Sequence, residues 1–231
     1  MTLRFLIFIL SLVVSHLCFS PYTAWAAINP ALGLAASGPV LVVHDGTGGL
    51  EADVVGNLSG KLAAAGYSVS KNVGVPRGRL AANKQIWDVR FNNTTPLTQG
   101  DIASYISYLA SGGSVFVVGE NLGFIVRDNS IVTLIQTAGG GAITITTPNN
   151  AQTVQALFTG PIAVASHVAF LGAAGTSAAG SLSFITKDAG NIGAAILYGP
   201  GALSNAPAGS LLIVFDIDCF RREFPASRRQ G

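Results

Sequence analysis

The feature that most constrains the fold is a short apolar run that ends in a turn flanked by glycines. Residues 113–124 read Gly-Ser-Val-Phe-Val-Val-Gly-Glu-Asn-Leu-Gly-Phe. A run this rich in β-branched residues predicts a buried strand at residues 114–118. A helical pattern follows from about Asp128, so the turn joins a strand to a helix, where several α/β enzymes carry a nucleophile. Here the apex of the turn is Asn121, which cannot act as a nucleophile at neutral pH.

Strands and helices alternate along the chain as far as Gly141. The expected strands span residues 39–45, 67–70, 85–91 and 114–118, and the expected helices span residues 50–65, 99–111 and 130–138. Thr98 followed by Asp101 is typical of a capping box at a helix start. Such alternation predicts right-handed crossovers and a doubly wound, mostly parallel sheet with helices on both faces.

The composition changes after Gly141. Alanine, glycine, serine and threonine dominate, and charged residues almost vanish between Asp128 and Lys187. We expect strands at residues 142–147, 164–171, 181–186, 194–198 and 211–215, and a short helix at residues 151–158. Short strands separated by glycine turns predict a β-rich C-terminal part that extends the sheet with antiparallel strands.

The N-terminus has the pattern of an export signal. Arg4 precedes an apolar stretch at residues 5–14, and Ala24-Trp25-Ala26 is a cleavage pattern. We expect a signal peptide at residues 1–26 and a linker at residues 27–38, with an uncleaved anchor as the alternative. Because no second apolar span follows, we expect an exported protein, periplasmic or extracellular, with no membrane span after signal removal. Because signal removal would leave Cys219 as the one cysteine, export without disulfides favours a bacterial envelope or secreted protein.

Length and charge limit the remaining classes. The chain has 231 residues, a net charge of +2 and only 10% charged residues. We expect one α/β domain at residues 39–218 and a polar, flexible tail at residues 219–231. A nucleic-acid partner is not expected, because such proteins usually carry a clustered basic face and the basic residues here cluster in the tail. After signal removal Cys219 would be the one cysteine, which excludes an intramolecular disulfide.

The turn at Asn121 resembles that of the class I glutamine amidotransferase-like proteins, a flavodoxin-like superfamily. The family pattern is Gly-x-Cys-x-Gly after a strand, completed by a later His and Glu, whereas this chain has Gly119-Glu-Asn121-Leu-Gly123. No His-x-Glu pair follows, and the one later histidine is His167. The resemblance spans roughly residues 39–141. It implies a flavodoxin-like sheet and a non-catalytic member of the superfamily.

Several polar side chains follow neighbouring strands of the expected sheet. Since ligands of doubly wound sheets bind beyond the carboxyl ends of the strands, these residues are candidate ligands of one crevice. The candidates are Asp45, Gly46, Asp88, Arg90, Glu120, Asn121 and Arg127. Carboxylates also cap helix starts and loops, which is the alternative role. The glycines at 46, 48 and 49 favour a tight turn over a phosphate site, because the third glycine of the dinucleotide motif is absent.

The leading functional hypothesis is a non-catalytic domain that binds a small polar ligand or a protein partner at this crevice. The first alternative is a metal-assisted hydrolase in which Asp45, Asp88 and Glu120 hold a divalent metal such as Mg²⁺. The second alternative is a structural component of the cell envelope, since the chain is poor in charge and its second half is rich in small residues. No cofactor other than a divalent metal is expected.

Overall fold

The computed structural model describes residues 37–46, 48–156, 166–168, 173–177 and 180–220. The expected signal peptide, all but the end of the linker and residues 221–231 of the expected tail lie outside this range. Within the described residues, no helix combines the length and the apolar character needed to cross a membrane.

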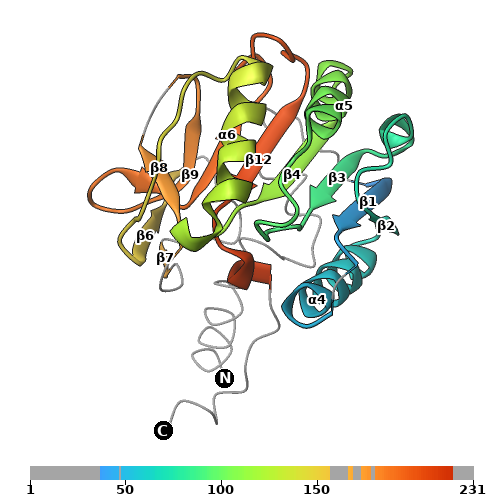
Figure 1. Ribbon diagram of the computed structural model, residues 1–231, viewed down its shortest axis with the longest axis horizontal. Coiled ribbons are helices and arrows are strands. Elements are labelled where there is room, and N and C mark those ends of the chain that lie inside the picture. The colour runs from blue at the N-terminus through green and yellow to red at the C-terminus, as the bar shows by residue number, and fades with distance from the viewer. Residues whose placement is uncertain (1–36, 47, 157–165, 169–172, 178–179, 221–231) are drawn as a thin grey trace, which may run out of the picture.

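The centre of the fold is a nine-stranded sheet with the spatial order β2-β1-β3-β4-β12-β11-β9-β6-β7 (Figure 1). The first five strands in this order pair in parallel. They are β2 (Ser68–Val73), β1 (Pro39–His44), β3 (Gln85–Asp88), β4 (Ser114–Val118) and β12 (Ser210–Val214). Taken in chain order they follow the 2-1-3-4-5 arrangement of flavodoxin-like folds. The predicted fold class is therefore confirmed.

The C-terminal half extends this sheet with antiparallel pairs, as the sequence predicts. The added strands are β11 (Ala195–Tyr198), β9 (Ser183–Lys187), β6 (Ala151–Val154) and β7 (Ser166–Val168). A second, three-stranded sheet contains β10 (Ile192–Gly193), β8 (Gly175–Ser177) and β5 (Ile145–Thr146).

Helices cover both faces of the parallel part of the sheet. Figure 1 shows α5 (Gln99–Ala110) and α6 (Ile125–Ala138) side by side over one face, and α4 (Leu50–Ala64) packs on the other. Side chains of β1 alternate accordingly: Val40 and Val42 pack in the α4 cluster, and Leu41 and Val43 pack in the cluster of α5 and α6. A strand covered on both faces needs this unbroken apolar run.

Short 3₁₀ helices complete the chain: η2 (Leu80–Ala82), η3 (Leu122–Phe124) and η5 (Ile217–Phe220). The side chain of Asn57 on α4 donates to the carbonyl oxygen of Phe220 at 2.8 Å, and the Phe220 ring packs edge-on against Trp87. These contacts hold η5 against α4 and β3.

Three local predictions were wrong. Residues 151–154 form the strand β6 instead of the start of a helix, because Gln152 and Val154 alternate inward and pair with neighbouring strands. Helix α6 begins at Ile125, earlier than the sequence pattern indicates. Strand β3 ends at Asp88 and does not continue to Phe91.

Candidate functional site

The sheet order reverses between β1 and β3, which is where flavodoxin-like folds bind ligands beyond the carboxyl ends of the strands. Asp45 directly follows β1, Asp88 ends β3, and Glu120 follows β4 after one glycine. Because these three strands are parallel neighbours, the predicted residues do gather at one edge of the sheet. Their side chains nevertheless belong to separate groups of contacts.

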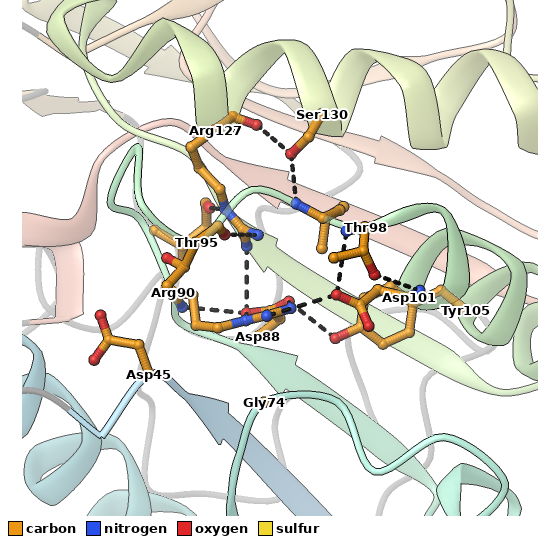
Figure 2. A network of polar contacts seen from close by, with 12 residues as sticks. Asp45, Gly74, Asp88, Arg90, Thr95, Thr98, Asp101, Tyr105, Arg127 and Ser130 are labelled. Carbon is orange, nitrogen blue, oxygen red and sulfur yellow. Dashed lines mark hydrogen bonds and ion pairs between the residues drawn. The ribbon is translucent and has the colours of Figure 1, made fainter.

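The first group surrounds Asp88, which is fully buried (Figure 2). The guanidinium of Arg90 donates to both carboxylate oxygens, at 2.9 Å from Nε to Oδ1 and 2.6 Å from Nη2 to Oδ2. The hydroxyl of Tyr105 on α5 donates to Oδ2 at 2.9 Å. This paired arrangement of two nitrogens on one carboxylate is among the strongest hydrogen-bonded ion pairs in proteins.

Arg127 closes this network from the first turn of α6. Its side chain is fully buried, with Nε donating to the carbonyl oxygen of Val118 at 3.3 Å and Nη1 donating to that of Thr95 at 3.1 Å. Nη2 lies 3.3 Å from Oδ1 of Asp88, an ion pair without the geometry of a hydrogen bond. The ion pair therefore ties α6 to β3 through the interior.

The charges of this network are fixed. Burial alone would raise the pKa of Asp88, but the adjacent Arg127 and Arg90 outweigh burial and hold it well below its usual range. Burial likewise lowers the pKa of Arg90, and the Asp88 carboxylate more than reverses that effect. A carboxylate held ionised by two guanidiniums is unsuited to act as a general base or a metal ligand.

Asp101 links the network to the start of α5 and confirms the predicted capping box. The hydroxyl of Thr98 accepts from the Asp101 N–H, and Oδ2 of Asp101 accepts from the Thr98 N–H, both at 3.2 Å. Asp101 also accepts from Nε of Arg77 at 3.0 Å and lies 3.7 Å from Nη1 of Arg90. The capping carboxylate is thus shared between the helix start and the buried ion pairs.

Asp45 belongs to a second group, at the start of α4. Its N–H donates to Oε1 of the buried Glu51 at 2.5 Å. Burial, followed by a hydrogen bond with the Asp45 side chain, raises the pKa of Glu51 to about 8. Gly46 has a φ of 84° and would bring a Cβ to 3.3 Å from Val73, so glycine fits this turn best.

The third group is the turn after β4. Asn121 has φ −64° and ψ 169°, which is relaxed extended backbone, so the turn lacks the strain of a nucleophile elbow. Its side-chain oxygen accepts from the Gly123 N–H at 2.9 Å and starts η3. Its side-chain nitrogen donates to Oε1 of Glu120 at 3.1 Å. Asn121 therefore has a structural role at the apex, as the cap of η3.

Glu120 fastens this turn to the end of β12. Its carboxylate accepts from the Asn121 N–H at 2.9 Å and, from the far side, from the Ile217 N–H at 3.0 Å. The N–H of Glu120 donates to Oδ1 of the fully buried Asp128 at 3.1 Å. Burial raises the pKa of both carboxyls, that of Asp128 to about 7.

Beyond the turn, apolar side chains face solvent. Leu122, Ile125 and Val126 are 44%, 38% and 50% exposed, and together with the half-buried Phe124 we call them the elbow surface. Asn93 fixes it, because its side chain accepts from the Val126 N–H at 3.0 Å and donates to the Gly123 carbonyl at 2.8 Å.

The predicted metal site is not formed. Among the described residues, no group of three or more histidine, cysteine, aspartate or glutamate side chains could hold a metal ion, so Asp45, Asp88 and Glu120 do not form such a group. The reason is that each carboxylate already has its own partners. The side chain of Asp45 shares a hydrogen bond with Glu51, Asp88 pairs with two arginines, and Glu120 accepts from backbone N–H groups.

Sequence reasoning missed Glu51, Tyr105, Asp128 and Asn93. A signal existed for Asp128: it lies next to the apolar stripe of Ile131, Leu134 and Ile135 on α6 and is buried with it. A charged residue beside a buried helical stripe indicates an internal partner. No comparable local signal marks Asn93, since its partners lie about 30 residues away in the chain.

Comparison with known proteins shows a shared fold only. No protein family matches the sequence, and no curated protein is significantly similar to it. The chain is similar in structure to the mmIFT52 N-terminal domain, with a TM-score of 0.55 and 12% identity over 78% of this chain and 87% of that one. At this identity the likeness supports the fold and says nothing about function.

Two further solved structures are more distant. One is described as a ThuA-like protein from Bacteroides uniformis, with a TM-score of 0.46 and 12% identity over 77% of this chain and 81% of that one. The other is the exo-β-1,4-mannosidase Op5Man5 from Opitutaceae bacterium strain TAV5, with a TM-score of 0.47 and 9% identity over 78% of this chain and 31% of that one.

Proposed function

We propose that this chain is a non-catalytic binding domain that holds a protein partner on the elbow surface. The observation that carries this proposal is the concentration of exposed apolar side chains. Four large hydrophobic side chains are exposed among the described residues, and three of them, Leu122, Ile125 and Val126, fall within five consecutive positions. Single exposed apolar residues are ordinary, whereas a group of them at one place favours a binding site.

The position of the elbow surface supports the same proposal. It lies just beyond the carboxyl end of β4, the edge at which doubly wound folds present their binding groups. Asn93, Asn121 and Glu120 hold the turn with side-chain hydrogen bonds. A surface fixed before binding loses less conformational entropy when a partner docks on it.

The contacts of the polar residues argue against the enzymatic alternative. Asp88 is paired with two arginines, and both carboxylate oxygens of Glu120 already accept hydrogen bonds within the protein. Asn121 stands where the amidotransferase-like pattern has its nucleophile. Membership of that superfamily without catalysis, and export through residues 1–26, are parts of the same proposal and rest on the sequence patterns.

A small polar ligand at the switch point between β1 and β3 is the second candidate. The buried Glu51 beside Asp45 favours it, because carboxyls with raised pKa concentrate at functional sites. A thermal-shift screen of small metabolites against wild type and Glu51→Gln would test it. A stabilisation seen in wild type and lost in the variant is the supporting result.

Site-specific photocrosslinking in the cells of origin tests the partner proposal. A benzoylphenylalanine residue at Leu122 should trap one defined protein, to be identified by mass spectrometry. The matched control carries the same residue at Ala63, which is exposed on α4. Trapping from position 122 and not from position 63 supports the proposal, and equal yields of the same product from both positions contradict it.

A further inference from the structure

We propose that Glu120 and Asp128 form a pH-sensitive latch that holds the elbow surface firmly in mild acid and loosens it as the pH rises through neutrality. The latch would regulate partner binding at the elbow surface, so its regulatory role rests on the proposed function. The latch itself is a property of the free protein and can be measured without a partner.

The geometry of Glu120 makes it the clamp of the turn. One carboxylate oxygen accepts from the N–H and the side-chain nitrogen of Asn121, and the other accepts from the N–H of Ile217 at the start of η5. The elbow and the end of β12 are therefore joined through a single buried side chain. If the backbone of residue 120 moves, both attachments change together.

Asp128 holds the backbone of Glu120 through a hydrogen bond from the first turn of α6. Oδ1 accepts from the Glu120 N–H at 3.1 Å, whereas Oδ2 is buried with no hydrogen-bond partner in the described part of the chain. A Cβ placed on Gly119 would lie 2.7 Å from Oδ1, which shows how closely the carboxyl fits under the turn. An ionised carboxylate in such a place would leave a charged oxygen without compensation.

The two carboxyls differ in how strongly their surroundings favour the ionised form. Glu120 accepts three hydrogen bonds, which favour its ionised form, while Asp128 accepts one. Burial first, and then the charge of Glu120, raise the pKa of Asp128 to about 7. The proton of the pair therefore resides on Asp128 in the latched state, and its loss creates two adjacent buried charges.

Other charged groups surround the pair. Arg127 on α6 favours ionised Asp128, although this arginine is already paired with Asp88. Asp218 on η5 disfavours ionised Glu120, and the buried Asp216 lies at the end of β12. Phe215, which directly follows β12, is the neighbour of Gly119 and is apolar. Apart from Arg127, these neighbours add to the cost of a second negative charge.

The sign of the pH effect follows. The folded-state pKa of Asp128 is raised above the ordinary value of 3.8, so its proton stabilises the latch fully below that value. The stabilisation is lost as the pH rises to about 7 and stays absent above it. Opening of the turn, in which Asp128 becomes solvated, should become correspondingly more frequent.

Hydrogen exchange of the full-length free protein tests the latch. The opening equilibrium of the Glu120 and Ile217 amides, corrected for the intrinsic exchange rate, should rise about tenfold per pH unit between pH 5 and 7 and then level off. The Val89 amide, which donates to the carbonyl oxygen of Val43 on β1 at 3.0 Å, serves as the internal reference. An opening equilibrium of these two amides that does not change between pH 5 and 8 would overturn the latch.

Variants assign the effect. Asp128→Asn should abolish the rise, and Asp53→Asn, at an exposed position on α4, should leave it intact. Glu120→Gln should shift the rise to lower pH, because Asp128 then lacks a charged neighbour. This second variant tests the latch even if Asp128→Asn does not fold. A rise that persists in Asp128→Asn contradicts the assignment. If the wild-type protein shows the expected rise in exchange with pH but binds no partner at any pH, the proposed function is contradicted and the latch is not.

Discussion

At the residue scale, charged side chains at the carboxyl edge of the sheet are buried and paired with one another. Sequence reasoning identified Asp88, Arg90 and Arg127 because each follows or faces the end of a strand, and the structure brings these three together. Sequence reasoning could not show that they neutralise one another, since that depends on the packing of α6 over β3. Their burial among these partners removes them from solvent.

Asp88→Ala should destabilise the fold by about 3 to 5 kcal/mol, because it leaves Arg90 and Arg127 buried without their counter-charge. Urea unfolding followed by circular dichroism measures this change. Arg77→Ala is the matched control, since the Arg77 side chain is 53% exposed and its pair with Asp101 should be worth less than about 1 kcal/mol. Equal losses for the two variants would show that the buried network has no special weight.

Glu51 gives a pH dependence of stability that a single substitution isolates. Its folded-state pKa of about 8 lies above the ordinary 4.5, so its contribution is complete below about pH 4.5 and is lost as the pH rises through 8. Glu51→Gln should reduce the fall in unfolding free energy between pH 5 and pH 9 by up to about 4 kcal/mol, the value that the shift in pKa implies. Urea titrations at both pH values measure it, and parallel curves for wild type and variant would refute the assignment.

At the element scale, the start of α6 differs most from the sequence pattern. Residues 125–129 look irregular in sequence because they carry exposed aliphatic residues next to a buried Arg-Asp pair. Their helical start depends on Asn93, which accepts from the N–H groups of Val126 and Arg127. A cap supplied from a distant loop leaves no local signal. The start of α5, by contrast, has its cap in its own sequence at Thr98 and was predicted.

Asn93→Ala should therefore lower the stability by about 1 kcal/mol, through the loss of the α6 cap. Asn93→Asp retains the oxygen acceptor and should recover part of the loss. Differential scanning calorimetry of the two variants provides the comparison. An alanine variant as stable as wild type would mean that the α6 start is held without this cap.

At the scale of the whole molecule, alternation of strands and helices was enough to predict the parallel half of the sheet. The sequence predicts that the second half extends this sheet, but not which strands join the two halves. The junction is the parallel pair of β4 and β12, which are almost a hundred residues apart in the chain. Every β12 side chain is buried, as expected for an apolar run in a central strand. Such a run does not indicate which strand it will pair with. The elbow surface lies at the edge of the sheet formed by the carboxyl ends of the parallel strands.

The most direct test of partner binding at the elbow surface is the affinity of the crosslinked partner, once purified, for wild type and for the double variant Leu122→Ser, Val126→Ser. Isothermal titration calorimetry should show binding weakened at least about tenfold, which corresponds to a combined loss of about 1.4 kcal/mol from the two truncated side chains. Ala63→Ser on α4 should bind as wild type does. An unchanged affinity in the double variant, with its fold intact, would contradict the assignment of the elbow surface as the binding site.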